Sequence, residues 1–140
     1  MRSAEAYLIA AEAIVKGASG GLQGSASDYY NATVNRAVGD SNTANMASDP
    51  TSLNSLETKS YRASGTVTID MILDERAREF MGEGLRWYDL KRTGKLLERS
   101  KSMNPWVGDL NFIKDYHQLR PIPLNEVDLS SNEVSQNPGY

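Results

Sequence analysis

The sequence predicts an all-α protein built from helical hairpins, long irregular loops and an extended C-terminal wrap. Apolar side chains recur at helical spacing in residues 3–16, 26–38 and 69–81. Glycine-rich text separates the first two of these segments, and glycines also follow the third. Alternation of the kind that marks a strand is confined to residues 66–69, which run directly into the third segment. We therefore expect no sheet beyond a short ladder.

The first hairpin is predicted to cover residues 2–38. Alanines line one face of its first helix, residues 3–16, and would allow a second helix to approach closely. The opposite face gathers the side chains Ala4, Tyr7, Leu8, Ala11 and Val15. A glycine-rich break then leads to Ser25 or Ser27, each a candidate N-cap for a second helix over residues 26–38.

A polar insertion and a second hairpin are predicted next. Residues 39–65 are rich in Asp, Asn, Ser and Thr without a helical period, so we expect a long loop. The second hairpin covers residues 66–99. Its first helix should end at Gly82 or Gly84, and its second should run from about Leu85 toward Arg99. Each hairpin has roughly the 34-residue length of a tetratricopeptide unit, without that repeat's full consensus.

Residues 100–140 are predicted to be mostly irregular. Pro121 and Pro123 favour an extended segment, and Pro123 is well placed to open a short helix through Val127. We treat residues 1–140 as the C-terminal part of one helical domain.

Arg76 falls inside the otherwise apolar stripe of the helix predicted at residues 69–81. A buried guanidinium needs a compensating carboxylate, and Glu79 and Glu83 lie on its flank. We therefore predict a structural ion network that fixes the angle between the two helices of the second hairpin. Its members are Glu75, Arg76, Glu79, Glu83, Arg86 and Asp89.

Composition argues against several classes of function. A formal net charge of −3 with mixed signs disfavours a nucleic-acid surface, and the absence of cysteine excludes thiolate metal sites. His117 is the single histidine and lacks metal-site neighbours, so we predict no metal, no cofactor and no catalytic triad. Glu75 and Glu79 share one helix, whereas glycosidase carboxylates face each other across the substrate. We predict no catalytic residue.

Five blocks of text carry a family resemblance: RSAEAYLIAAEA, YYNATVNRA, ILDERAREFMGEGLRWYDLKRTG, LRPIPLNEV and QNPGY. Their order and spacing from residue 2 to residue 140 resemble the C-terminal part of the RagB/SusD family, and the third block is the most specific. Members of this family are nutrient-binding outer-membrane lipoproteins of Bacteroidetes. A complete member is several times longer and begins with a lipoprotein signal and a lipid-bearing cysteine. We therefore expect this chain to be a piece of a longer protein.

The resemblance implies a binding protein without enzymatic activity, on a tetratricopeptide-like helical scaffold. It implies a location on the cell-surface side of the outer membrane, through an N-terminal lipid anchor that this chain lacks. The implied ligand is an oligosaccharide or a peptide, and the implied partner is a SusC-like TonB-dependent transporter that imports the ligand. Without the rest of the protein, apolar surface would be exposed, so we expect the chain to self-associate.

Aromatic side chains are the best candidates for sugar contacts, because sugar rings pack their C–H face on Trp or Tyr. Trp106 follows an Asn-Pro pair in an irregular loop and is the first candidate, with plugging of the scaffold as its alternative role. Tyr61 and Arg62, at the end of the polar insertion, are the second. Trp87 is expected to pack in the core.

Two other functions remain open from the sequence. A free-standing helical-repeat adaptor would bind peptide or protein in a concave groove, and a hydrolase would use the carboxylates. We rank both below a glycan-binding scaffold.

Overall fold

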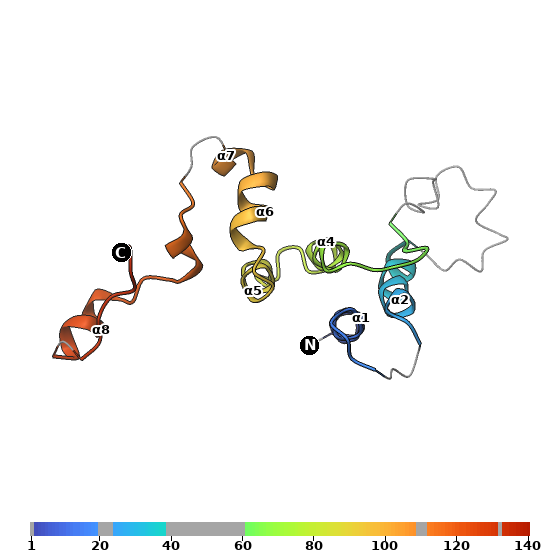
Figure 1. The fold of residues 1–140 in the computed structure, drawn as a ribbon, viewed down its shortest axis with the longest axis horizontal. Coiled ribbons are helices and arrows are strands. Elements are labelled where there is room, and N and C mark those ends of the chain that lie inside the picture. Colours follow the sequence, from blue (N-terminus) through green and yellow to red (C-terminus); the bar gives the residue numbers. More distant parts are fainter. Residues whose placement is uncertain (1, 20–23, 39–60, 109–111, 132) are drawn as a thin grey trace. The chain divides into compact units, whose positions relative to one another are not determined.

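The computed structural model describes residues 2–19, 24–38, 61–108, 112–131 and 133–140 (Figure 1). The regular structure in these residues is helical, and no strand occurs among them. The prediction of an all-α fold is therefore confirmed. Most of the predicted polar insertion, residues 39–60, lies outside the described residues. The chain divides into two compact units, Met1–Gly84 and Leu85–Tyr140, which we describe separately.

The first unit contains three described helices: α1 (Ser3–Val15), α2 (Ala26–Val38) and α4 (Ile69–Glu79). Helix α1 contacts both α2 and α4. Its buried residues are Ala4, Leu8, Ala11 and Glu12, whereas Ala6 and Ala13 are exposed, so the prediction that the alanine face receives the second helix was wrong. The core is made of fully buried apolar side chains from all three helices, Leu8, Ala11, Tyr30, Val34, Ile72 and Leu73. Each of the larger ones stabilises the fold by about 1.5–3 kcal/mol relative to exposure to water.

Polar caps fix where α2 and α4 begin. The backbone N–H and the hydroxyl of Ser25 donate to Asp28 Oδ2 at 2.8 and 2.7 Å, while Ser25 Oγ accepts from the Asp28 backbone N–H. This reciprocal arrangement identifies Ser25 as the cap of α2. Thr68 Oγ1 accepts from the backbone N–H of Met71 at the start of α4. Each cap satisfies a backbone donor that has no partner within its own helix.

The second unit contains the helices α5 (Arg86–Arg92), α6 (Leu96–Met103) and α7 (Pro105–Gly108), the 3-10 turn η2 (Asp115–Gln118), and α8 (Leu124–Leu129). Helix α6 contacts α5, α7 and η2. Pro123 stands at the N-cap of α8, so the short helix predicted to open there is present. It ends at Leu129, two residues after the predicted end.

The prediction of one helix from Leu85 toward Arg99 was wrong, because the chain turns between α5 and α6. Gly94 has φ +70°, a conformation that glycine adopts without the Cβ penalty of other residues. The hydroxyl of Thr93 donates to the carbonyl of Asp89 at 2.7 Å, and the Lys95 N–H donates to the carbonyl of Leu90 at 2.8 Å. These bonds end α5 and allow α6 to start in a new direction.

The last residues of the chain hold an extended segment that precedes α8. The side-chain amide of Gln136 exchanges two hydrogen bonds with the backbone of Ile122, at 2.7 and 2.8 Å. Asn137 Nδ2 donates to the carbonyl of Arg120 at 2.6 Å, and the Tyr140 hydroxyl donates to the carbonyl of Leu119 at 2.8 Å. We call residues 136–140 the C-terminal clasp. The clasp satisfies backbone groups that Pro121 and Pro123 prevent from joining a helix.

Candidate functional site

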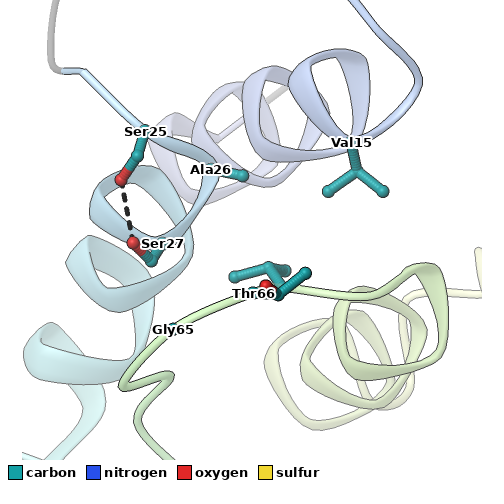
Figure 2. A pocket seen from close by; sticks show the side chains of 7 residues that line it. Val15, Ser25, Ala26, Ser27, Gly65 and Thr66 are labelled. Carbon is teal, nitrogen blue, oxygen red and sulfur yellow. Dashed lines mark hydrogen bonds between the residues drawn. The ribbon is translucent and has the colours of Figure 1, made fainter.

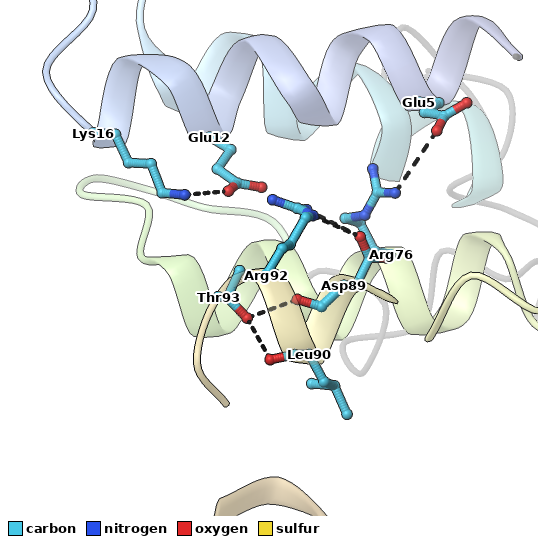
Figure 3. A network of polar contacts seen from close by, with 8 residues as sticks. All are labelled: Glu5, Glu12, Lys16, Arg76, Asp89, Leu90, Arg92 and Thr93. Atoms are coloured by element: carbon cyan, nitrogen blue, oxygen red, sulfur yellow. Dashed lines mark hydrogen bonds and ion pairs between the residues drawn. The ribbon is translucent and has the colours of Figure 1, made fainter. Parts of the chain in front are cut away.

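Arg76 is buried within α4, with 5% of its surface exposed, as its position in the apolar stripe predicts. Its guanidinium carbon lies 4.9 Å from the centroid of the Phe80 ring. Its Nη2 lies 3.9 Å from Glu5 Oε1 of α1 (Figure 3). Arg76 therefore connects α4 to α1 through charge and stacks on an aromatic ring of its own segment.

Glu79 and Glu83, the carboxylates expected beside Arg76, bind other cations in the first unit. Arg2 Nη1 lies 3.2 Å from Glu79 Oε1, and Arg2 Nη2 donates to the Glu79 carbonyl and to Glu83 Oε1 at 2.8 and 2.6 Å. Arg36, near the end of α2, also donates to Glu79 Oε1. One carboxylate thus ties α1, α2 and α4 together. Sequence spacing does not predict this role, because both arginines are distant from Glu79 along the chain.

Several ion pairs share one arrangement, in which a buried carboxylate meets a cation that reaches water. In the first unit these are Lys16 with Glu12 and Arg78 with Glu75, both at 2.7 Å. In the second unit Arg92 meets Asp89 at 3.0 Å. Figure 3 draws the first and last of these pairs. Arg86 and Asp89 belong to the second unit, so the six predicted network residues are divided between units that are described separately.

Tyr61 and Arg62 lie beside α2 and α4. The backbone carbonyl of Tyr61 accepts from the buried Tyr30 hydroxyl at 3.1 Å, and the Tyr61 ring carries the Arg78 guanidinium at 4.6 Å from its centroid. Burial raises the pKa of Tyr30, and the nearby Glu75 carboxylate adds to the rise while Arg78 opposes it. Arg62 is partly buried, and its Nε and Nη2 atoms have no hydrogen-bond partner among the described residues. One face of the Tyr61 ring is thus already covered by the Arg78 guanidinium and is not open to a ligand.

Trp106 is exposed over 83% of its surface, as its role as the first ligand candidate requires. It lies in the short helix α7, where its backbone N–H donates to Asn104 Oδ1 at 3.1 Å. Met103, just before α7, is also exposed. Trp106 thus presents an open indole, and the alternative of plugging the scaffold does not describe it in this structure.

Hollows are found among the described residues of the first unit, and two of them are not lined by a predicted ligand residue. The larger, about 520 Å³, is drawn in Figure 2 and is lined by small side chains at the end of α1, the start of α2 and the approach to α4. These residues are Val15, Ser25, Ala26, Ser27, Gly65, Thr66 and Val67. The smaller, about 200 Å³, lies between α1 and α2. The larger hollow offers hydroxyls but no charged or aromatic side chain, which a specific sugar site would require.

Comparison with known proteins decides the family. The sequence model of the SusD family matches residues 1–140. The chain belongs to the SusD family. It is also 33% identical over 142 residues to the starch-binding protein SusD of Bacteroides thetaiotaomicron. That alignment covers 99% of this chain and 21% of the relative. This member of the SusD family therefore spans about a fifth of the length of the curated protein that it matches.

His117 has a packing role in this SusD-family chain. Its Nδ1 accepts from the backbone N–H of Lys114 at 2.8 Å, and its ring lies 4.3 Å from that of Tyr116 and 6.1 Å from that of Tyr140. Within the described residues, no group of three or more histidine, cysteine or acidic side chains is arranged to hold a metal ion. No helix in the same residues combines the length and apolarity needed to cross a membrane.

Proposed function

We propose that this chain is the scaffold portion of a SusD-like glycan-binding lipoprotein, which captures oligosaccharides for import by a TonB-dependent outer-membrane transporter. The observation that supports the proposal most strongly is the family match over residues 1–140. The similarity to a starch-binding protein adds a carbohydrate as the class of ligand. We propose that the protein binds its ligand without altering it.

The proposed location is the cell-surface side of the outer membrane, through an N-terminal lipid anchor in a longer protein that contains this chain. The proposed partner is a SusC-like transporter. The three helices of the first unit would act as a support, because Glu79 and Arg76 connect them through buried charge. Such a support fixes the positions of the loops that contact ligand.

Trp106 is the proposed sugar platform of this portion, with Tyr61 and Arg62 as a second group. An exposed indole can pack on the C–H face of a sugar ring, and partly exposed neighbours can bind its hydroxyls. Trp106 meets the first requirement because most of its ring is open to solvent. Tyr61 meets it less well, since Arg78 already stacks on its ring.

Retardation in polysaccharide-containing gels tests the ligand. The chain and the longer protein would be run with starch, with other soluble polysaccharides and with a peptide pool as competitor. We expect retardation by at least one polysaccharide and its loss in Trp106→Ala. Phe112→Ala removes another exposed aromatic ring from the same unit and is the matched control. Competition by peptide alone would favour a peptide ligand, and equal effects of both variants would remove Trp106 from the site.

Fractionation of the native organism tests the location and the partner. A tag at the chromosomal gene should appear in the outer-membrane fraction, incorporate labelled fatty acid and co-purify with a TonB-dependent transporter. A tagged product that is soluble, free of lipid and bound to other proteins would instead support the helical-repeat adaptor.

A further inference from the structure

One indole ring of the second unit is flanked by two cationic side chains. The Arg120 guanidinium carbon lies 4.5 Å from the centroid of the Trp87 ring, and Lys91 Nζ lies 5.0 Å from it. Tyr88 meets Trp87 edge-on at 5.5 Å, and Arg120 is also 5.8 Å from the Tyr88 ring. We call these four residues, Trp87, Tyr88, Lys91 and Arg120, the Trp87 cluster. It corrects the expectation that Trp87 packs only in the core, since Trp87 remains partly exposed.

The two cations of the Trp87 cluster have no carboxylate partner among the described residues. Among the described residues, neither the Arg120 guanidinium nor the Lys91 ammonium takes part in a hydrogen bond or an ion pair, and both side chains are exposed. Other cations of the same unit differ, because Arg92 and Lys95 each meet a carboxylate at 3.0 Å. The cluster therefore concentrates uncompensated positive charge in a chain whose net charge is negative.

The C-terminal clasp holds the backbone around Arg120 in place. The C-terminal clasp binds the carbonyl of Arg120 itself, the carbonyl of Leu119 just before it, and the backbone of Ile122 two residues after it. Lys91 is placed on the same helix as Trp87, one turn later, where side chains four residues apart are neighbours. The backbone positions of both donors are thus set relative to the indole before any ligand arrives, which lowers part of the entropic cost of binding.

The chemistry of this arrangement selects an anion that carries a ring. A guanidinium that stacks through its face keeps the N–H groups at its edge free to bind a carboxylate in a bidentate manner. The Tyr88 ring, exposed over 57% of its surface, can pack on the C–H face of a pyranose. We propose that the Trp87 cluster binds an acidic sugar residue, such as a uronate. This inference rests on the proposed glycan-binding function and names the substrate class.

Titration with oligogalacturonate tests the inference, with a neutral galacto-oligosaccharide of the same length as comparison. Isothermal titration calorimetry of the unaltered chain reports binding and leaves the proposed sugar platform, Trp106, in place. We expect the acidic oligosaccharide to bind, and 0.5 M salt to weaken its binding. Arg120→Gln and Lys91→Gln should each weaken binding about tenfold or more, because a hydrogen bond to a charged group is lost. Lys101→Gln changes the net charge equally on another exposed lysine and should have little effect.

Three outcomes would overturn the acidic-sugar site. Equal affinity for the neutral oligosaccharide, unchanged in Arg120→Gln, would refute it while leaving the proposed glycan binding intact. Binding to vesicles of anionic lipid but not to oligogalacturonate would assign the cluster to the membrane surface. Equal weakening by Lys101→Gln would show a general effect of charge. Circular dichroism of each variant would check that the helices are retained, and Arg120→Lys should restore only part of the affinity, since lysine lacks the planar fork.

Discussion

Replacement of Arg76 by alanine should destabilise the chain by about 2–5 kcal/mol, from three separate losses. Stacking of a buried cation on Phe80, 4.9 Å from the ring centroid, contributes up to about 2 kcal/mol. The ion pair with Glu5 contributes at most about 1 kcal/mol, because the two atoms are 3.9 Å apart and 23% of the Glu5 side chain is exposed. Loss of the buried side-chain stem leaves a cavity that costs about 2 kcal/mol or more.

Urea unfolding followed by circular dichroism at the helix band measures this cost. Arg76→Met keeps the volume of the stem and should cost no more than about 1 kcal/mol, since an apolar residue can replace a buried ion pair with little loss. A double-mutant cycle with Phe80→Leu should give a coupling of about 1 kcal/mol. An alanine variant whose unfolding free energy stays within about 0.5 kcal/mol of wild type would refute the reasoning, as would equal costs for alanine and methionine.

The remaining predictions concern exposure and pH. Trp106→Ala should change unfolding free energy in urea by less than about 0.5 kcal/mol, because the ring is exposed; a larger loss would assign it to the core. Hydrogen bonds from Ser25 lower the pKa of Asp28 below 3.8. The stabilisation that the ionised Asp28 contributes is therefore present above that pH and is lost as pH falls through the folded-state pKa. Acid unfolding of wild type and Asp28→Asn should show that difference. Burial raises the pKa of Tyr30 above 10.0. The stabilisation that protonated Tyr30 contributes is therefore full below pH 10.0 and is lost as pH rises through the folded-state pKa. Tyr30→Phe should lack this loss of stability at high pH. Leu124 and Leu129 are exposed in α8, and sedimentation should reveal self-association that Leu129→Glu weakens.

Local sequence rules predicted the helices well where a cap and an apolar stripe agree. Ser25 precedes α2, and α4 occupies most of the predicted span, because its apolar residues repeat at the helical period. The same rules failed between Leu85 and Arg99, where good helix formers surround Gly94. A single glycine inside a helical pattern is often tolerated. Only the backbone bonds around Thr93, seen in the structure, show that the chain turns there.

The candidate site was predictable in its exposure and burial, but less so in its partners. Burial of Arg76 follows from the stripe. Trp106 is exposed, as a ligand candidate must be, although the chain around it forms the short helix α7 and not the predicted irregular loop. The pairing of Glu79 with Arg2 and Arg36 does not follow, because sequence spacing identifies only neighbours within one helix. The Trp87 cluster could not be predicted from the sequence for the same reason. Arg120 reaches Trp87 through the clasp, whose bonds join segments that no local period relates.

The pairing of enclosed carboxylates with outward-reaching cations has a consequence for how freely this protein can vary. The cation of such a pair reaches water, so its side chain can change with little repacking. Its carboxylate cannot, because Glu75, Glu79 and Asp89 are each almost fully enclosed. In a saturation library selected for folded protein, the acidic positions should tolerate few residues and their basic partners many. Neutral substitutions should therefore accumulate mainly at the basic residue of each pair.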